Sequence, residues 1–217
     1  MPTHTVKQGD TLLSIAAENG FSSWETIWMD PQNQALRDKR KDPQVLADGD
    51  SVFIPEKKTR IVHLETDKKH TFVVPRVKAW FRVTLRDNEG RLVANRRFNL
   101  DVAGKVKTGT TDASGKIELE VDPKPAEGTL KVFLDDADPS KNITWKVKLG
   151  HLDPLDKLSG VKARLTNLGF ACGTIDDAVN EETKTALRNF QIVYRLPVTG
   201  EADQPTKDKL LVVHDNR

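Results

Sequence analysis

The sequence predicts a multidomain α+β protein: a βααβ unit, then an all-β sandwich, then a small three-helix domain. Near both ends of the 217-residue chain, apolar residues recur at a helical spacing of three and four, whereas in the middle they alternate with polar residues. The charge balance changes at the same places, because the middle carries 18 basic and 13 acidic side chains while each end has a small acidic excess. We therefore expect domains at 1–58, 59–150 and 151–217, joined at short polar or turn-prone seams.

The first unit is expected to begin with a short strand at 4–6 and to close with a strand at 51–54. Asp10 or Thr11 can cap a first helix, since both side chains carry an oxygen that accepts from backbone N–H groups. A second helix is expected within 22–28, where apolar residues at helical spacing fall on one face. Two helices between two short strands follow from this pattern.

This unit resembles a LysM domain, through HTVKQGDTLLSIAAENGF at its start and LADGDSVFIP at its end. LysM domains bind glycans that contain N-acetylglucosamine, chiefly peptidoglycan or chitin, in a shallow groove between two loops. An N-acetyl group offers an amide donor, an acceptor and a methyl, which a glycine turn beside an apolar side chain can bind. The resemblance implies eight glycan-binding residues, four in each loop: Gly9, Asp10, Thr11 and Leu12, then Pro43, Gln44, Val45 and Leu46.

Two features of this unit leave alternatives open. The Leu12 side chain is expected either to contact the ligand or to pack in the core. Trp24 and Trp28 are expected in the core, because apolar residues at helical spacing usually face inward. The middle of the unit, MDPQNQALRDKRKDPQ, is longer than in a minimal LysM domain and borders the second loop. Its basic cluster, Lys39-Arg40-Lys41, is expected to be a solvated face.

The middle segment is expected to be a β-sandwich. Alternating runs and the turn signals at 87–90 and 112–115 predict eight strands, near 62–64, 71–74, 79–86, 92–101, 106–111, 116–121, 129–134 and 143–148. The run LRDNEGRLVANRRFNLDVAGKVKTGTTDASGKIELEV resembles an immunoglobulin-like or carboxypeptidase-regulatory-type sandwich. This resemblance implies a spacer or a protein-docking domain.

The third segment is expected to be helical, with caps at Asp153-Pro154, Asn180 and Asp203. It resembles the three-helix peptidoglycan-binding domain often attached to cell-wall hydrolases, through VKARLTNLGF, GTIDDAVNEETKTALRNFQ and LPVTGEADQPTKDKL. The resemblance implies a second wall-binding site, for which five residues are candidates: Gly173, Ile175, Asp176, Gln191 and Tyr194.

The sequence contains no metal-ligand or nucleophile motif. The five histidines lack ligand spacing, and the acidic run 135–138 is better explained as a solvated turn than as a calcium loop. Cys172 is expected to be a buried small residue rather than a catalytic thiol. The two end modules leave about 90 residues, which is short for a wall-hydrolase domain. The expectation is therefore no enzyme, no cofactor and no metal, with a hydrolase site in 59–150 as an alternative.

A net charge of +2 gives no argument for nucleic acid as a partner, and no stretch is apolar enough to span a membrane. The start of the chain does not read as a signal peptide. Two wall-binding modules without such a signal resemble accessory proteins of type VI secretion and related phage-tail-like injection machines. The leading interpretation is a peptidoglycan-binding adaptor, made in the cytoplasm and exported by such a machine, with a spike or effector protein as a further partner. The alternative is a structural or effector-loading protein that uses the same folds for protein contacts.

Overall fold

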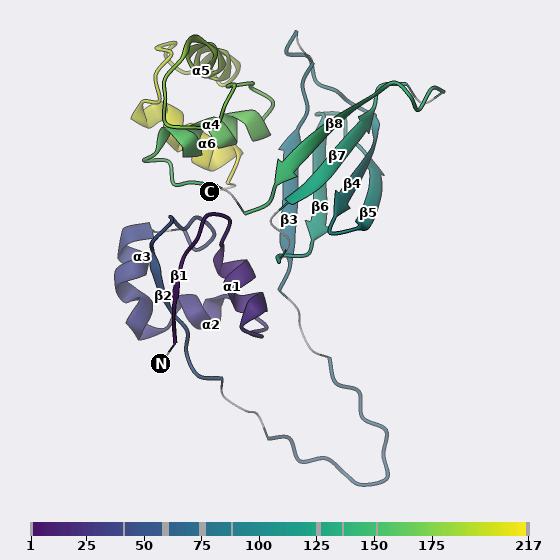
Figure 1. Cartoon of the computed structure of the whole chain (residues 1–217), viewed down its shortest axis with the longest axis vertical. Coiled ribbons are helices and arrows are strands. Elements are labelled where there is room, and N and C mark those ends of the chain that lie inside the picture. The colour runs from purple at the N-terminus through teal and green to yellow at the C-terminus, as the bar shows by residue number, and fades with distance from the viewer. Residues whose placement is uncertain are drawn as a thin grey trace.

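The computed structural model describes residues 2–40, 42–57, 61–73, 77–87, 89–124, 127–135, 137–150 and 152–215. Helices and strands form three groups, each around its own hydrophobic cluster (Figure 1). The predicted fold class, multidomain α+β, is confirmed. The predicted domain boundaries fall at 58/59 and 150/151; residues 58–60 and 151 lie outside the described residues, and the boundaries stay predictions.

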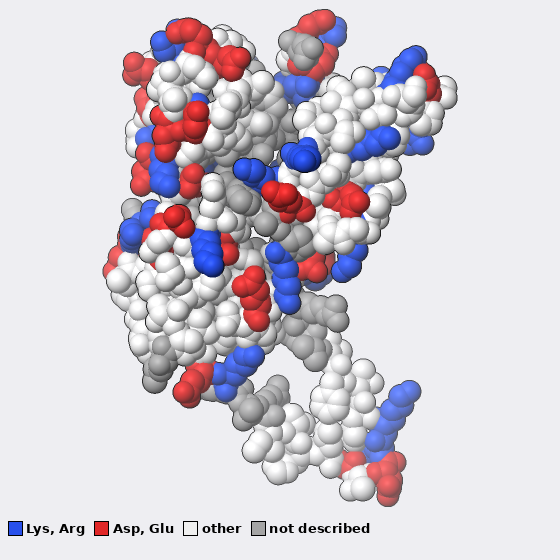
Figure 2. Space-filling view, viewed as in Figure 1, with Lys and Arg blue, Asp and Glu red and all other residues white. Residues whose placement is uncertain are grey.

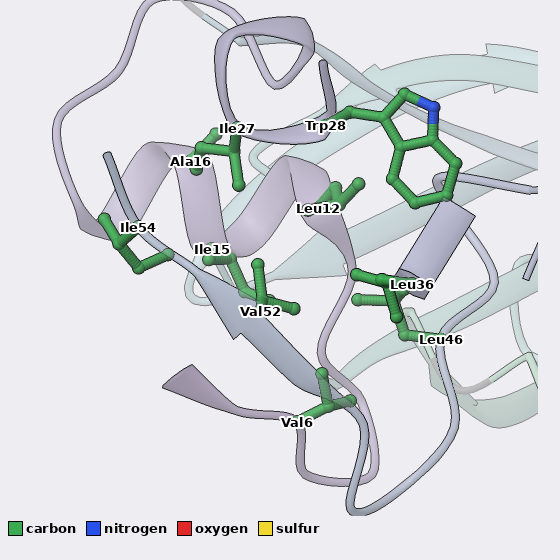
Figure 3. Close-up of a cluster of buried hydrophobic side chains, with 10 residues drawn as sticks. All are labelled: Val6, Leu12, Ile15, Ala16, Ile27, Trp28, Leu36, Leu46, Val52 and Ile54. Atoms are coloured by element: carbon green, nitrogen blue, oxygen red, sulfur yellow. The ribbon is translucent and has the colours of Figure 1, made fainter. Parts of the chain in front are cut away.

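The first unit pairs two short antiparallel strands, β1 (Thr3–Thr5) and β2 (Ser51–Phe53), with helices α1 (Leu12–Glu18) and α2 (Glu25–Trp28) between them. Thr11 and Ser14 form a capping box at the start of α1, because the side chain of each accepts from the backbone N–H of the other. Ten buried residues from these elements and from the segments that connect or follow them form the core shown in Figure 3.

The long middle of this unit folds into further helix, which the sequence did not predict. A 3-10 turn, η1 (Pro31–Asn33), leads directly into α3 (Gln34–Arg40). Asn33 is almost fully buried, donates to the Ile27 and Phe53 carbonyls, and accepts from Phe53 N–H. The insertion is therefore fixed to the edge of β2 through one amide side chain.

The middle unit has two sheets, a pair β3-β6 and a four-stranded sheet in the order β5-β4-β7-β8. Apolar side chains from both sheets form one core cluster, so the two sheets pack as a sandwich. The strands are antiparallel, with bounds β3 (Ala79–Thr84), β4 (Arg97–Val102), β5 (Lys105–Thr110), β6 (Lys116–Val121), β7 (Glu127–Phe133) and β8 (Asn142–Lys148).

Two predicted strands of the sandwich, at 62–64 and 71–74, are wrong over their described residues. Residues 61–73 contain no strand and form part of a long excursion between β2 and β3 (Figure 1). Their apolar side chains face solvent, with Val62 48%, Phe72 66% and Val73 86% exposed. An alternating run becomes a strand only when a partner strand supplies hydrogen bonds, and no partner lies beside this segment among the described residues.

The third unit contains α4 (Leu158–Asn167), α5 (Glu181–Val193) and α6 (Gln204–Val213) around a core centred on Leu165 and Phe190. The Asn180 and Asp203 side chains accept from backbone N–H groups of the first turns of α5 and α6, as predicted. The predicted cap at Asp153-Pro154 is wrong, because α4 begins four residues later, at Leu158. Asp153 instead accepts from the Ser159 hydroxyl and pairs with Lys157.

The sandwich contacts the third unit through Arg86. Its guanidinium carbon lies 4.9 Å from the centroid of the Phe170 ring, and its Nε donates to the Leu168 carbonyl at 3.3 Å. Gly169 (φ +84°) lies so close to Arg86 that a Cβ there would be 2.7 Å from the Arg86 Cγ. A glycine that can adopt positive φ thus allows close packing between two units.

Candidate functional site

A pocket of about 270 Å³ lies between the first and third units. One wall comes from the first unit and the other from the segment that leads into α4. The lining residues are Gln8, Gly9, Leu46, Asp48, Gly150, Leu152, Asp153 and Lys157. Polar side chains and two leucines thus surround a space that neither unit forms alone.

Two glycines determine how closely the walls approach. Gly9 has φ +101° and Gly150 has φ +75°, conformations that side-chain-bearing residues rarely adopt. A Cβ at Gly150 would meet the carbonyl oxygen of Gly9 and would lie 3.3 Å from the Thr11 methyl carbon. The segment at 150 therefore packs directly against the first predicted glycan-binding loop.

The four residues of the first predicted loop lie in different environments, some at the surface and one in the core. Gly9 lines the pocket, whereas the Asp10 carboxylate is engaged locally, accepting from Lys7 N–H at 2.9 Å and from His4 Nε2 at 2.7 Å. Thr11 is occupied by its capping box. Leu12 has no exposed surface and points into the core beside Trp28 (Figure 3), so the core alternative holds for its side chain.

The second predicted loop also has mostly buried side chains. Leu46 is 6% exposed and lines the pocket at its edge, while Val45 is 5% exposed, and Pro43 and Gln44 are half-buried. The Gln44 Oε1 is buried without a hydrogen-bond partner among the described residues. Buried side-chain acceptors normally have a partner, so this atom is an exception among the described residues. Gln44 does not line the pocket.

In the third unit, Gln191 is part of the fold rather than of an open groove. It is fully buried, and its amide donates to the Thr199 and Thr206 hydroxyls and to the Glu201 carbonyl while accepting from Gly200 N–H. Tyr194 is half-buried, with its ring centroid 4.7 Å from that of Phe190. The structure therefore separates these two residues from the three other candidates.

Those three, Gly173, Ile175 and Asp176, lie together on one exposed loop. Lys162 on α4 holds this loop in place. Its side chain is fully buried, and its ammonium donates to Asp176 at 2.6 Å and to the Thr174 and Ala178 carbonyls. The hydrogen bond from Lys162 lowers the pKa of Asp176. Ile175 is 48% exposed at the same loop. The loop therefore presents backbone groups and apolar side chains to solvent, since Val179 on the same loop is also exposed, at 63%.

Cys172 is buried, as expected, and burial raises the pKa of its thiol to about 11. A thiol protonated at neutral pH is a poor nucleophile. Within the acidic run 135–138, where residue 136 lies outside the described residues, Asp135 and Asp138 accept from nearby backbone N–H groups. In the described part of the chain, no group of three or more His, Cys, Asp or Glu side chains could hold a metal ion.

The basic cluster at 39–41 was expected to be a solvated face. This holds for Lys39, whose side chain is 60% exposed, but not for Arg40, whose side chain is 12% exposed; residue 41 lies outside the described residues. Lys39 and Arg40 both pair with Asp50, which is 3% exposed, at 2.8 and 2.6 Å. Burial alone would raise the pKa of Asp50, but hydrogen bonds from Arg40, Lys39 and Ala47 N–H lower it to about 2. Sequence spacing did not show this role, because the carboxylate lies about ten positions away from its partners.

The sequence also missed most of the pocket. Gln8 and Asp48 flank the predicted loops, and four residues come from the entry to the third unit: Gly150, Leu152, Asp153 and Lys157. The turn glycines were the one available signal. On the face in Figure 2, basic and acidic side chains are interspersed rather than gathered by sign. None of the described helices has the length and apolar character needed to cross a bilayer.

Comparison with known proteins identifies the third unit. Residues 156–210 match the family described as "Putative peptidoglycan binding domain". A spore cortex-lytic enzyme from Oceanobacillus iheyensis is 47% identical over 51 residues, which are 24% of this chain and 18% of that enzyme. The chain thus matches less than a fifth of the length of this relative. No solved structure matches.

These findings correct one expectation. The chain was predicted not to be an enzyme, but a segment closely similar to part of it occurs in a protein named as a lytic enzyme. Because the similarity covers 51 residues only, it shows no catalytic activity for this chain, and the presence of the domain is no argument against one. The predicted resemblance of the third unit is confirmed: the chain carries a C-terminal peptidoglycan-binding domain.

Proposed function

We propose that the protein binds the glycan of a cell wall through both terminal units, with the loops at 9–12 and 43–46 acting as a LysM-type site. The observation that carries this proposal is the match at 156–210, over a segment that folds as three helices around its own core. Supporting it, residues from both predicted loops, Gly9 and Leu46, line one pocket. Two weak sites on one chain would also raise avidity for a polymer.

Co-sedimentation with purified bacterial sacculi tests this function, with the pelleted fraction read across increasing salt. We expect pelleting that survives salt, because the wall-facing loop at Ile175 offers backbone groups and an apolar side chain rather than a basic patch. Ile175→Ala should lower the pelleted fraction several-fold. Val212→Ala, which shortens a side chain of similar exposure (53%) on α6, is the matched control. Wild-type protein that stays in the supernatant at low salt would refute the proposal.

We further propose that the protein serves a type VI or phage-tail-like injection machine as an adaptor and reaches the envelope through it. The support is the combination of modules, which is an argument from architecture. The sandwich would act as spacer or docking domain. Five of its large apolar side chains are between 41% and 50% exposed: Trp80, Leu92, Leu134, Ile143 and Trp145.

Those exposed side chains also favour the second candidate function, an effector-loading protein that makes protein contacts with the same folds. Gel filtration with a purified spike subunit or toxin separates the two candidates from a simple wall anchor. A stable complex that Trp145→Ala weakens would support docking through the sandwich. If the protein elutes separately from every spike and effector tested but still binds sacculi, the proposed role in an injection machine is refuted.

A further inference from the structure

We infer that the pocket between the terminal units is a composite sugar site, which holds one N-acetylated residue of a neutral wall glycan. Half of its eight lining residues come from the entry to the third unit: Gly150, Leu152, Asp153 and Lys157. The inference rests on the proposed function, since it names the ligand of the same first-unit loops. It adds that the first unit does not bind alone.

The chemistry of the lining matches a sugar. The carboxylates of Asp48 and Asp153 can accept from hydroxyl groups, and the Lys157 ammonium can donate to a ring or acetyl oxygen. Leu46 and Leu152 offer apolar surface to a methyl group or to the C–H face of a ring. A few convergent polar groups among apolar ones are the usual composition of a small-molecule site.

The charge of the lining argues against an acidic ligand. The lining includes two acidic residues, Asp48 and Asp153, and one lysine, Lys157, whose ammonium is already 3.3 Å from the Asp153 carboxylate. A carboxylate brought in by a ligand would be the third in the pocket and would meet this acidic excess, where like charges repel more strongly than in bulk water. A neutral N-acetylated sugar meets no such cost.

The size and the walls of the pocket set the number of sugar residues. A volume of about 270 Å³ lies just below the ~300–1,000 Å³ of sites for drug-sized ligands, so it suits one ring of a chain. The close packing of Gly150 on Gly9 holds the two walls at this spacing. The site therefore exists only while the first and third units are in contact.

Isothermal titration of the full chain with a soluble N-acetylglucosamine tetramer tests the inference. Lys157→Ala should weaken binding about tenfold through loss of a donor, and Gln8→Trp should abolish it by filling the pocket from the other wall. Lys184→Ala is the matched control, because Lys184 is also a lysine of the third unit, with a side chain exposed to 41% against 43% for Lys157 and paired at 2.8 Å with Glu181. The control should leave affinity unchanged, and circular dichroism should show the same fold in all variants.

The outcomes separate this inference from the proposed function. If Gln8→Trp abolishes binding while Lys157→Ala binds as tightly as Lys184→Ala, the first unit binds alone and the composite site is refuted. If the wild type pellets with sacculi but does not bind the tetramer, the assigned ligand is wrong and wall binding stands. If the wild type neither pellets with sacculi nor binds the tetramer, both the composite site and the proposed wall binding are refuted.

Discussion

Asp50 shows how a single buried carboxylate organises the first unit. It receives hydrogen bonds from Lys39 and Arg40 on α3 and from Ala47 N–H, so it joins the inserted helix to the turn before β2. Burial of the carboxylate alone would be unfavourable, and the three donors more than offset that cost, because its pKa falls to about 2. The ionised form is therefore the one that the fold stabilises.

The ion pairs of Asp50 predict that the stability of the protein depends on pH in the acid range. Because the folded pKa of Asp50, about 2, is below the ordinary 3.8, its contribution to stability is complete above pH 4. It is lost as the pH falls from about 4 to 2. Asp50→Asn should lower the free energy of unfolding by about 2 kcal/mol at pH 7. The difference from wild type should shrink towards zero near pH 2.

Urea unfolding followed by tryptophan fluorescence at several pH values measures this difference. Asp38→Asn is the control, because Asp38 is an exposed carboxylate on the same helix, α3. It should leave stability near that of the wild type at each pH. A stability difference for Asp50→Asn that is the same at pH 7 and pH 2.5 would show that the loss is not electrostatic.

At the scale of elements, the sequence predicts what local chemistry decides. The caps at Thr11, Asn180 and Asp203 were predictable because each side chain accepts from an N–H group three residues away. The turn at 112–115 was predictable for the same reason, since Asp112 accepts from Ser114 and Lys116 N–H. Such signals lie within a few residues of the element they specify.

Elements that depend on distant partners were not predictable in the same way. The alternating run at 62–64 looks like a strand, but it lies in a segment without a partner strand among the described residues. The start of α4 was placed too early, because Asp153 bonds to Ser159 and Lys157 instead of capping. Periodicity describes one segment at a time, whereas pairing and capping choices depend on what packs beside it.

The candidate site shows the same division. The first-unit wall of the pocket could be located through Gly9 and Leu46, because family resemblance marks both loops. The other wall comes from residues more than 100 positions later in the chain, and no local pattern connects Lys157 with Gly9. Burial of Leu12 and Gln191 likewise follows from packing that spacing alone does not reveal.

At the scale of the whole molecule, contacts between the units determine whether the pocket forms. The entry segment 150–157 follows directly from β8 of the sandwich, and Arg86 holds the sandwich against α4 and the turn after it. A cation over an aromatic ring contributes roughly 0.5–2 kcal/mol, so this one side chain stabilises the contact between the two units. The sandwich is thus more than a spacer in this arrangement, because it positions one wall of the site.

The last prediction follows from that contact. Arg86→Ala should let the third unit move away from the sandwich, which would raise the radius of gyration measured by small-angle X-ray scattering. It should also weaken tetramer binding several-fold, although Arg86 does not line the pocket. Arg82→Ala is the matched control. Arg82 lies on β3 itself, over the Trp80 ring at 5.4 Å, and pairs with Glu118 within the sandwich. Equal scattering and equal affinity for the two variants would show that Arg86 does not hold the units together, and the pocket would then need another source of support.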